Sequence, residues 1–278
     1  MKIALITNPT KDIGLVSALR AAELLRGRAE LFMSNDCRLT GDRDVTYLPY
    51  EQIWKTVDTA IVIGGDGTLL RVATQCAKNS IPALGINLGK VGFLTEVDPG
   101  NMEAAFDALL SGEYIKERRM LLKIRVNDED VSYQALNDTV ISKTDNARLI
   151  SMDLYTDGEL VNHYVGDGLI IATPTGSTGY SISAGGPVVD PRMELYVATP
   201  ICAHMLAVRS AVLSAERELT LRLGRDYADN CAKITTDGER QRFISPEDEL
   251  RITRSDYKFE LIRLGTQSFY NTLISKLS

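Results

Sequence analysis

The sequence has 278 residues, of which 44% are hydrophobic and 24% charged, a balance that supplies a sizeable core and excludes global disorder. The 31 basic and 37 acidic residues leave a formal charge of −6 without a long run of one sign, which argues against nucleic acid as a partner. The four widely spaced cysteines and only two histidines argue against a disulfide framework and against a zinc site.

The first hundred residues alternate between short apolar runs and amphipathic segments. Buried strands are predicted at Lys2–Thr7, Leu31–Met33, Thr59–Ile63 and Ile81–Ile86, and helices at Asp12–Arg26, Thr68–Lys78 and Pro99–Leu110. This β-α-β rhythm predicts an α/β domain with a parallel, doubly wound sheet.

From about Ile115 the sequence becomes rich in strands. The predicted strands are Leu121–Val126, Val131–Leu136, Thr139–Ser142, Met152–Tyr155, Leu160–Tyr164, Leu169–Ala172, Leu219–Leu223, Lys233–Thr235, Leu250–Thr253 and Phe259–Arg263. Asp157-Gly158 between two of these runs predicts a hairpin, and Ser268–Leu277 predicts a closing helix. We therefore expect an α/β domain at 1–100, a β-rich dinucleotide-binding domain at 101–265, and a C-terminal helix at 266–278 with the first domain as its packing partner.

No run of 18 apolar residues occurs, so no membrane span is expected. The N-terminal apolar run Met1–Asn8 is too short for a signal peptide with its cleavage site. We therefore expect a cytoplasmic protein. Its acidic charge does not exclude small anionic ligands, because backbone N–H groups and a metal ion can hold a nucleotide.

The segment Gly64-Gly65-Asp66-Gly67-Thr68 lies between a predicted buried strand and a predicted helix. Ligands of open α/β sheets bind at the carboxyl ends of the strands, where glycines let backbone N–H groups approach a phosphate. An acidic side chain at Asp66 would repel a bare phosphate, so we interpret it as a proton acceptor or as a ligand of phosphate-bound Mg²⁺. The alternative is a tight turn in which Asp66 caps the helix.

A second segment rich in glycine and hydroxyl groups runs from Thr173 to Pro187. It cannot build a core, but it offers donors and a closely approaching backbone, as a polyphosphate or ribose site requires. The alternative is a flexible surface loop. The apolar run Leu169–Ala172 before the segment and the Gly-Gly-Pro turn at its end favour an ordered, functional segment.

The two segments together resemble the NAD kinase family, which pairs a Gly-Gly-Asp-Gly-Thr loop with a Thr-Pro-Thr-Gly-Ser-Thr-x-Tyr-Ser-x-Ser-x-Gly-Gly-Pro segment. Further matches are Asn87–Leu94, Ala135–Asp138, Gly166–Leu169 and Asp237-Gly238, so that the resemblance covers about residues 61–238. The first loop also resembles loops of lipid kinases and phosphofructokinases, whereas the second segment is much more specific.

The resemblance implies a site between two domains, at which ATP or another polyphosphate donates a phosphoryl group to the adenosine ribose 2′-hydroxyl of NAD and NADP is formed. It implies Mg²⁺ or another divalent cation, without direct ligands from the protein, and a homodimer or homotetramer. Asp66 is the implied catalytic base. The implied nucleotide-binding residues are Gly65, Gly67, Thr68, Leu70, Phe93, Asn137, Asp138, Asp167, Thr178, Gly179, Tyr180 and Ser183.

Within this resemblance, Asn137 and Asp138 hold nucleoside parts of NAD, and Asp167 contacts the other end of the dinucleotide. The residues alone leave other interpretations open: Phe93 as a core aromatic, and Asn137-Asp138 as a turn between strands. The sequence departs from the family pattern at Gly179, where alanine is frequent, and at Arg209, which is followed by serine rather than proline.

Two other functions share some of these features. A lipid or sugar kinase can use the same first loop, but a lipid kinase needs an exposed apolar entry surface, and no apolar helix of that kind is evident in the sequence. A non-catalytic dinucleotide sensor gains nothing from an acid beside phosphates, so Asp66 argues against it.

Overall fold

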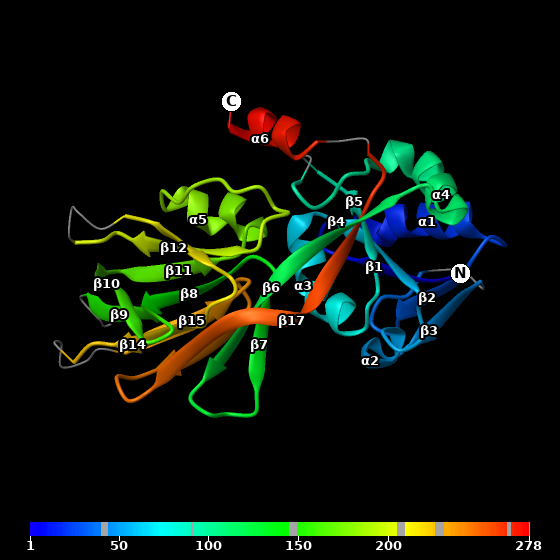
Figure 1. The fold of residues 1–278 in the computed structure, drawn as a ribbon. Coiled ribbons are helices and arrows are strands. Elements are labelled where there is room, and N and C mark those ends of the chain that lie inside the picture. The colour runs from blue at the N-terminus through cyan, green and yellow to red at the C-terminus, as the bar shows by residue number, and fades with distance from the viewer. Residues whose placement is uncertain are drawn as a thin grey trace. The chain divides into compact units, whose positions relative to one another are not determined.

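The structure is a computed structural model that describes residues 1–39, 44–89, 92–144, 149–204, 209–225, 231–265 and 268–277. The chain forms two compact units, the first comprising Met1–Arg118 with Phe259–Ser278 and the second comprising Arg119–Lys258. Two long strands, β6 (Ile115–Val126) and β17 (Glu249–Arg263), each contribute residues to both units (Figure 1).

The first unit contains a parallel sheet in the order β17-β5-β4-β1-β2-β3. Its remaining strands are β1 (Lys2–Thr7), β2 (Glu30–Ser34), β3 (Val45–Leu48), β4 (Thr59–Gly64) and β5 (Ala83–Asn87). The chain builds outward from β1 to β2 and β3, and then returns to the other side of β1 for β4 and β5. The predicted parallel, doubly wound sheet is therefore confirmed.

Helices cover both faces of this sheet. They are α1 (Val16–Leu25), α2 (Tyr50–Ile53), α3 (Asp66–Lys78) and α4 (Met102–Ser111), with 3₁₀ turns at Ile13–Leu15 and Pro99–Asn101. The helix α6 (Phe269–Leu277) also belongs to this unit and contacts Phe93. In β5, Leu84 and Ile86 belong to the apolar cluster that contains α1 and α4. Gly85 lies between them and faces Leu69 of α3, as the two-residue period of a strand requires.

The second unit is a sandwich of antiparallel sheets. One sheet has the order β10-β9-β14-β17, with β6 paired to β17 and β7 paired to β6; the other has the order β13-β12-β11-β8-β15-β16. Their strands are β7 (Ser132–Ala135), β8 (Asp138–Lys143), β9 (Ile150–Thr156), β10 (Glu159–Gly166), β11 (Gly168–Ala172), β12 (Leu195–Ile201), β13 (Ala211–Ser214), β14 (Leu219–Leu223), β15 (Ala232–Thr236) and β16 (Arg240–Ile244). The expected β-rich second domain is confirmed.

The core of the sandwich contains residues from both sheets, such as Leu122 and Met152 of the first and Leu169 and Tyr196 of the second. The opposite face of the second sheet has its own small cluster, which includes Val189 and alternate residues of β11 and β12. The segment with η3 (Thr175–Thr178) and α5 (Tyr180–Ser183) lies over this face (Figure 1).

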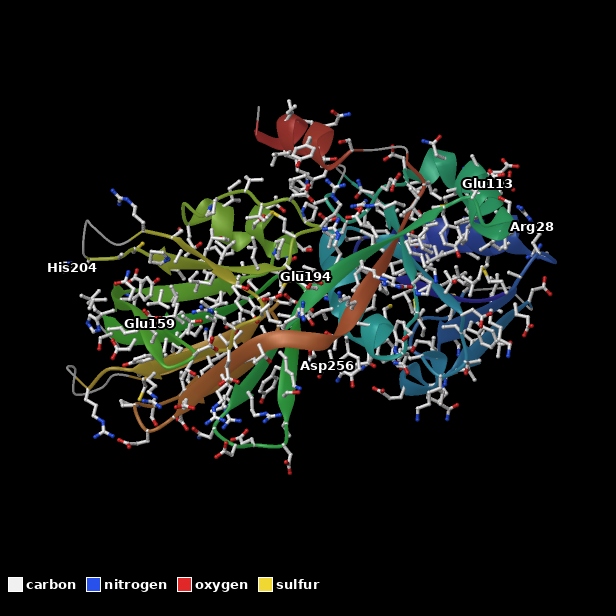
Figure 2. The ribbon with its side chains drawn as sticks, viewed as in Figure 1. Arg28, Glu113, Glu159, Glu194, His204 and Asp256 are labelled. Atoms are coloured by element: carbon white, nitrogen blue, oxygen red, sulfur yellow. The ribbon has the colours of Figure 1, made fainter. Side chains whose placement is uncertain are left out.

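The turn between β9 and β10 consists of Asp157 and Gly158, both with positive φ (48° and 84°). Positive φ at both central residues is typical of the two-residue turns of hairpins, so the hairpin prediction is confirmed. Charged side chains form pairs such as Arg28 with Asp107, and Glu194 with Lys258. Figure 2 labels Arg28 in the first unit and Glu194 in the second. In the part of the chain that the structure describes, no helix is long and apolar enough to cross a bilayer.

The two units differ from the expected division at residues 100 and 265. α4 packs on the parallel sheet and therefore extends the first unit to Arg118, and the end of β17 pairs with β5 and returns the chain to that unit. α6 belongs to the first unit as well. Residues 266, 267 and 278 of the expected C-terminal segment lie outside the described residues.

Candidate active site

The first glycine loop lies at the carboxyl end of β4. Because β4 ends at Gly64 and α3 begins at Asp66, only the extended Gly65 (φ −154°) separates the strand from the helix. A Cβ at Gly64 would lie 2.3 Å from Thr68 Oγ1, so this glycine lets the strand approach the helix. A Cβ at Gly67 would meet no atom within 4 Å, so the packing of the protein itself does not require a glycine there.

The Asp66 carboxylate binds a backbone segment that follows β5. Its Oδ2 accepts the N–H of Phe93 at 2.8 Å. Its Oδ1 accepts the N–H groups of Leu94 and Thr95 and the hydroxyl of Thr95, all at 3.1 Å. Four donors therefore fix the orientation of the carboxylate, which also stands in the first turn of α3, where the helix dipole favours an anion.

Gly92 is a residue of this site that the sequence analysis did not single out. A Cβ on Gly92 would lie 1.9 Å from Asp66 Oδ1 and 2.5 Å from Thr95 Oγ1. Only a residue without a side chain allows the backbone to close around the carboxylate. The sequence signal that could have identified it is its place as a glycine within the matched segment Asn87–Leu94. Lys90 and Val91 of that segment lie outside the described residues.

Phe93 is partly exposed, and its contacts come from the C-terminal end of the chain. Its ring centroid lies 5.8 Å from that of Phe269 and 4.8 Å from the ammonium of Lys276, both on α6. Its carbonyl accepts a hydrogen bond of 2.8 Å from Arg263. Phe93 is therefore held between β17 and α6 and is not an interior aromatic; Leu70, on α3, is also partly exposed.

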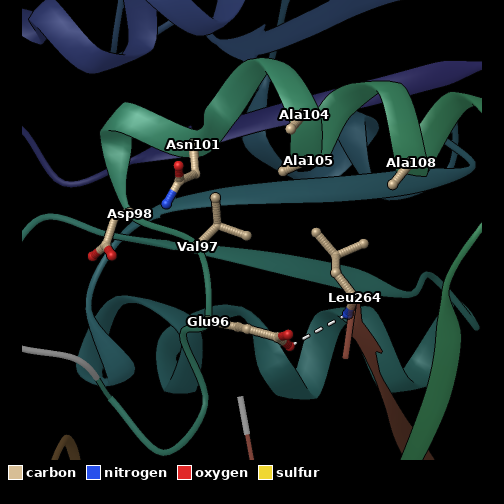
Figure 3. A pocket seen from close by; sticks show the side chains of 8 residues that line it. All are labelled: Glu96, Val97, Asp98, Asn101, Ala104, Ala105, Ala108 and Leu264. Atoms are coloured by element: carbon tan, nitrogen blue, oxygen red, sulfur yellow. Dashed lines mark hydrogen bonds between the residues drawn. The ribbon is translucent and has the colours of Figure 1, made fainter. Parts of the chain in front are cut away.

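A cavity of about 460 Å³ lies along residues 96–98, the continuation of the segment that binds Asp66 (Figure 3). One wall is α4, with Ala104, Ala105 and Ala108, and the rest is formed by Glu96, Val97, Asp98, Asn101 and Leu264. Glu96 accepts the N–H of Leu264 at 3.4 Å and pairs with Arg263 at 3.6 Å. Arg263 thus joins this cavity wall to the carbonyl of Phe93.

A cation stands beside the loop, and sequence reasoning missed it. The ammonium of Lys11, which follows β1, lies 3.3 Å from the position that a Cβ would take at Gly65. Since β1 and β4 are neighbours in the sheet, their carboxyl ends bring these two residues together. The contact depends on strand order, which leaves no local signal in the sequence.

In the second unit, Asn137 lies just before β8 and Asp138 is the first residue of β8, and both are bound by other parts of the chain. Asp237, in the turn between β15 and β16, accepts the N–H groups of Leu136, Asn137 and Asp138 at 2.7, 2.8 and 3.1 Å. The N–H of Thr173 donates to the Asn137 carbonyl at 2.8 Å. This part of the backbone is therefore fixed, although the Asn137 side chain remains partly exposed.

Asp138 and Asp237 form a pair of neighbouring carboxylates. Burial raises the pKa of Asp138, which is only 6% exposed, to about 7, and the charge of Asp237 adds to the rise. Burial also raises the pKa of Asp237 to about 6, against the lowering effect of its three N–H donors. Asp138 therefore holds a proton more readily than Asp237.

The segment Thr173–Pro187 begins with buried residues that bind one another and the Asn137 loop. Thr173 Oγ1 donates to the Leu136 carbonyl at 2.6 Å and accepts the N–H of Gly176 at 3.1 Å. A Cβ at Gly176 would lie 2.1 Å from the carbonyl oxygen of Asn137, so a glycine is required for this close approach. The segment is consequently an ordered part of the second unit.

The later residues of the segment are open to solvent. Tyr180 is 47% exposed, Ser183 is exposed, and Thr178 and Gly179 are partly exposed. A Cβ at Gly179 would lie 3.4 Å from Asn137 Nδ2 and 3.8 Å from an Asp138 oxygen. The structure therefore brings Gly179 together with Asn137 and Asp138, two side chains that the sequence placed in the same pocket.

Asp167 stands at the other end of β8. The register pairs Gly168 with Ser142 and Ala172 with Asp138, a separation of four residues, or about 13 Å along the strand. The Asp167 carboxylate pairs with Lys143 at 2.7 Å. Within this chain, Asp167 therefore lies apart from Asn137 and Asp138, and any single ligand that contacts all three must be extended.

Among the described residues, no group of three or more His, Cys, Asp or Glu side chains is placed to hold a metal ion. Asp66 is the carboxylate of the glycine loop itself, and its Oδ1 already accepts three donors. The donor set therefore suits a cation that arrives with its own phosphate ligands better than one held by a protein cage.

Comparison with known proteins shows which family the sequence matches. Residues 4–114 match the family model of the ATP-NAD kinase N-terminal domain, and residues 136–264 match that of the C-terminal domain. The sequence is 40% identical to the NAD kinase of Carboxydothermus hydrogenoformans over 97% of each chain. It is 37% identical to the NAD kinase of Symbiobacterium thermophilum over 100% of this chain and 99% of the relative.

Two solved structures are similar over the whole of this chain. An NAD kinase from Archaeoglobus fulgidus in complex with ATP has a TM-score of 0.78 at 27% identity, with 98% of its chain covered. The yeast NADH kinase complexed with NADH has a TM-score of 0.89 at 23% identity, with 87% of its chain covered. The second likeness concerns the fold alone.

Proposed function

The chain belongs to the NAD kinase family, and we infer from this how its residues serve the reaction. The enzyme transfers a phosphoryl group from ATP to the adenosine ribose 2′-hydroxyl of NAD and forms NADP. The observation that carries our assignment of the chemistry is the Asp66 carboxylate, fixed by four donors at the end of β4 beside the glycine loop.

We propose that Asp66 orients the acceptor hydroxyl and takes its proton. The 2′-oxygen attacks the γ-phosphorus, the bond between this phosphorus and the bridging oxygen of ADP breaks, and the proton passes to the carboxylate. Oδ2 is the suitable acceptor, because it has one donor among the described residues whereas Oδ1 has three. A loose transition state tolerates late proton transfer, so orientation matters more than basicity.

We propose that the donor phosphates bind at the N-terminus of α3. Gly65 and Gly67 let the backbone approach them, and Lys11 adds a positive charge beside Gly65. Thr68 supports the loop from inside, because its hydroxyl is buried against Gly64. A divalent cation bound to the ATP phosphates would neutralise part of their charge. We assign it no ligand from the chain, since the phosphates and water suffice to hold Mg²⁺.

We propose that the second unit holds the dinucleotide. Asn137 and Asp138 would bind the nucleoside hydroxyl and amide groups. Tyr180, the single aromatic residue of the segment Thr173–Pro187 and exposed at its surface, would stack on a ring. Thr178, Gly179 and Ser183 complete the proposed pocket of the second unit. Phe93, partly exposed in the first unit, is proposed as a separate nucleotide contact. Asp167 would bind the far end of the extended ligand, as its distance from Asp138 along β8 requires.

The reaction is tested by a coupled assay with purified protein, NAD, ATP and Mg²⁺, in which an NADP-specific dehydrogenase reports the product. We expect a rise in NADPH absorbance that depends on all three reactants. Parallel reactions with polyphosphate in place of ATP, and with NADH in place of NAD, identify the donor and acceptor. Absence of NADP in every combination would contradict the function.

An Asn137→Ala variant is expected to raise the KM for NAD about tenfold or more and to leave the KM for ATP nearly unchanged. Removing one hydrogen bond to a buried polar ligand group typically costs about 1–3 kcal/mol. The backbone contacts of residue 137 use its N–H and carbonyl, which alanine retains, so the fold should persist. Steady-state kinetics with each substrate varied in turn separates this result from equal weakening for both, which would contradict the assignment.

We further propose a homodimer or homotetramer in the cytoplasm. All four cysteines are free thiols, Cys37, Cys76, Cys202 and Cys231, which fits a reducing compartment. Light scattering coupled to size-exclusion chromatography measures the oligomer directly, and a monomer at micromolar concentration would contradict it.

A further inference from the structure

Asp237 makes more backbone contacts than an ordinary turn residue. Its carboxylate accepts three consecutive N–H groups, those of Leu136, Asn137 and Asp138, which lie about 100 positions earlier in the sequence. Its own N–H donates to the Asp138 carbonyl at 3.0 Å. Three adjacent N–H groups directed at one point form a site for an anion, and the carboxylate of Asp237 supplies that anion.

The conformation of the turn is adapted to this contact. Asp237 and Gly238 both have positive φ, 46° and 76°, in the turn that joins β15 to β16. Positive φ is uncommon for a residue with a side chain, and aspartate tolerates it better than most. In this conformation the carboxylate can reach back to the segment before β8, which pairs with β15.

We propose that Asp237 is a positioning residue, which fixes Asn137 and Asp138 in the orientation that binds the acceptor nucleotide. The proposal rests on the assignment of these two residues to NAD. The Asn137 backbone is bound on the other side by Thr173 and abuts Gly176, so its orientation has little freedom while Asp237 is charged. Without the carboxylate, three N–H groups lose their common acceptor.

The pair also has an electrostatic consequence. The charge of Asp237 contributes to raising the pKa of Asp138 to about 7, after burial as the main cause. Among the described residues, the charges that interact with Asp237 include those of Asp138 and Glu239. Its own pKa of about 6 leaves Asp237 more ionised than Asp138 at neutral pH. Removing this charge must lower the pKa of Asp138 and shift any pH dependence of NAD binding toward lower pH.

The test is an Asp237→Asn variant, assayed with NAD and ATP varied separately between pH 5.5 and 8.5. We expect the KM for NAD to rise about tenfold, the KM for ATP to stay within about twofold, and the midpoint of the pH dependence of the NAD KM to move to lower pH. Hydrogen exchange at residues 136–138 should accelerate relative to the rest of β8. If the variant does not fold, Asp237→Ser leaves room for water to solvate the N–H groups, and the same results are expected.

Asp248→Asn is the matched control in the same unit. The Asp248 carboxylate accepts the N–H and hydroxyl of Ser245 at 2.8 and 2.9 Å, at the end of β16 remote from Asp237. The Asp248→Asn variant should have a lower melting temperature, but its KM values for NAD and ATP and the pH midpoint should not change. Unchanged NAD KM and pH midpoint in the folded Asp237 variant would overturn the inference, whereas a wild-type protein that forms no NADP would overturn the proposed function instead.

Discussion

An Asp66→Asn variant is expected to lose about 10²–10⁴-fold in turnover and to retain NAD binding, because it removes the proton acceptor and its charge. The carboxylate stands at the first turn of α3, where the donor phosphates are proposed to bind. Binding of ATP without metal should improve in the variant, since a like charge has gone. Initial rates and NAD titrations on one preparation measure all three effects.

The contacts of Asp66 also predict a change in stability. The carboxylate accepts three N–H groups and one hydroxyl from residues 93–95, whereas an asparagine directs its own N–H₂ group at some of these donors. The variant should therefore melt at a lower temperature, and its turnover must be expressed per folded molecule. A lower turnover then reports chemistry and not loss of protein.

Asp12→Asn supplies the matched control. Asp12 is a buried carboxylate of the same unit that accepts the N–H groups of Ser17 and Ala18 and the hydroxyl of Thr7. Its loss should lower stability by a comparable amount and leave turnover per folded molecule near that of the wild type. If Asp66→Asn behaves in the same way, Asp66 is a structural cap and the assignment of the base is wrong.

The fold could be predicted from local patterns because each pattern has a direct physical cause. Buried parallel strands such as Thr59–Gly64 read as continuous apolar runs, and Asp157-Gly158 provides the positive φ values that a tight hairpin needs. The predicted strand boundaries were wrong where polar residues continue a strand. The runs Leu250–Thr253 and Phe259–Arg263 were predicted as two strands but are parts of one strand, β17. The intervening polar residues 254–258 gave no apolar signal.

The start of α3 shows a similar limit. The sequence placed the helix at Thr68, because glycine and aspartate are poor residues for a helix interior. The structure begins it at Asp66, where an acid in the first turn interacts favourably with the helix dipole. In the structure Asp66 is therefore part of the helix, and its carboxylate contacts the segment after β5.

The candidate site was predicted as a set of segments, without the contacts between them. Asp66 binds residues 27 to 29 positions away, and Asp237 binds residues about 100 positions away. Strand order creates both contacts, and one sequence carries no local trace of strand order. The resemblance assigned Asp138 to the nucleoside parts of NAD and Asp167 to the other end of the ligand, and the register places these residues at opposite ends of β8.

Gly176→Val is expected to abolish measurable binding of NAD. A Cβ at this position would lie 2.1 Å from the Asn137 carbonyl oxygen and 2.5 Å from its carbon, and both atoms belong to the backbone. Neither can rotate away, since Asn137 is fixed by hydrogen bonds from Thr173 and to Asp237. The added side chain must therefore separate the segment Thr173–Pro187 from Asn137 and Asp138 and open the proposed nucleotide pocket.

Isothermal titration calorimetry with NAD, after circular dichroism has established that the variant is folded, measures this effect. Gly100→Val is the control for the same added side chain, because a Cβ at Gly100 meets no atom within 4 Å and its φ is not positive. That variant should bind NAD as the wild type does. A less severe variant, Gly176→Ala, carries the same Cβ conflict and should also lose affinity if valine prevents folding. Normal NAD affinity in a folded Gly176 variant would mean that the close approach to Asn137 does not support the pocket, and that the segment is a bystander in binding.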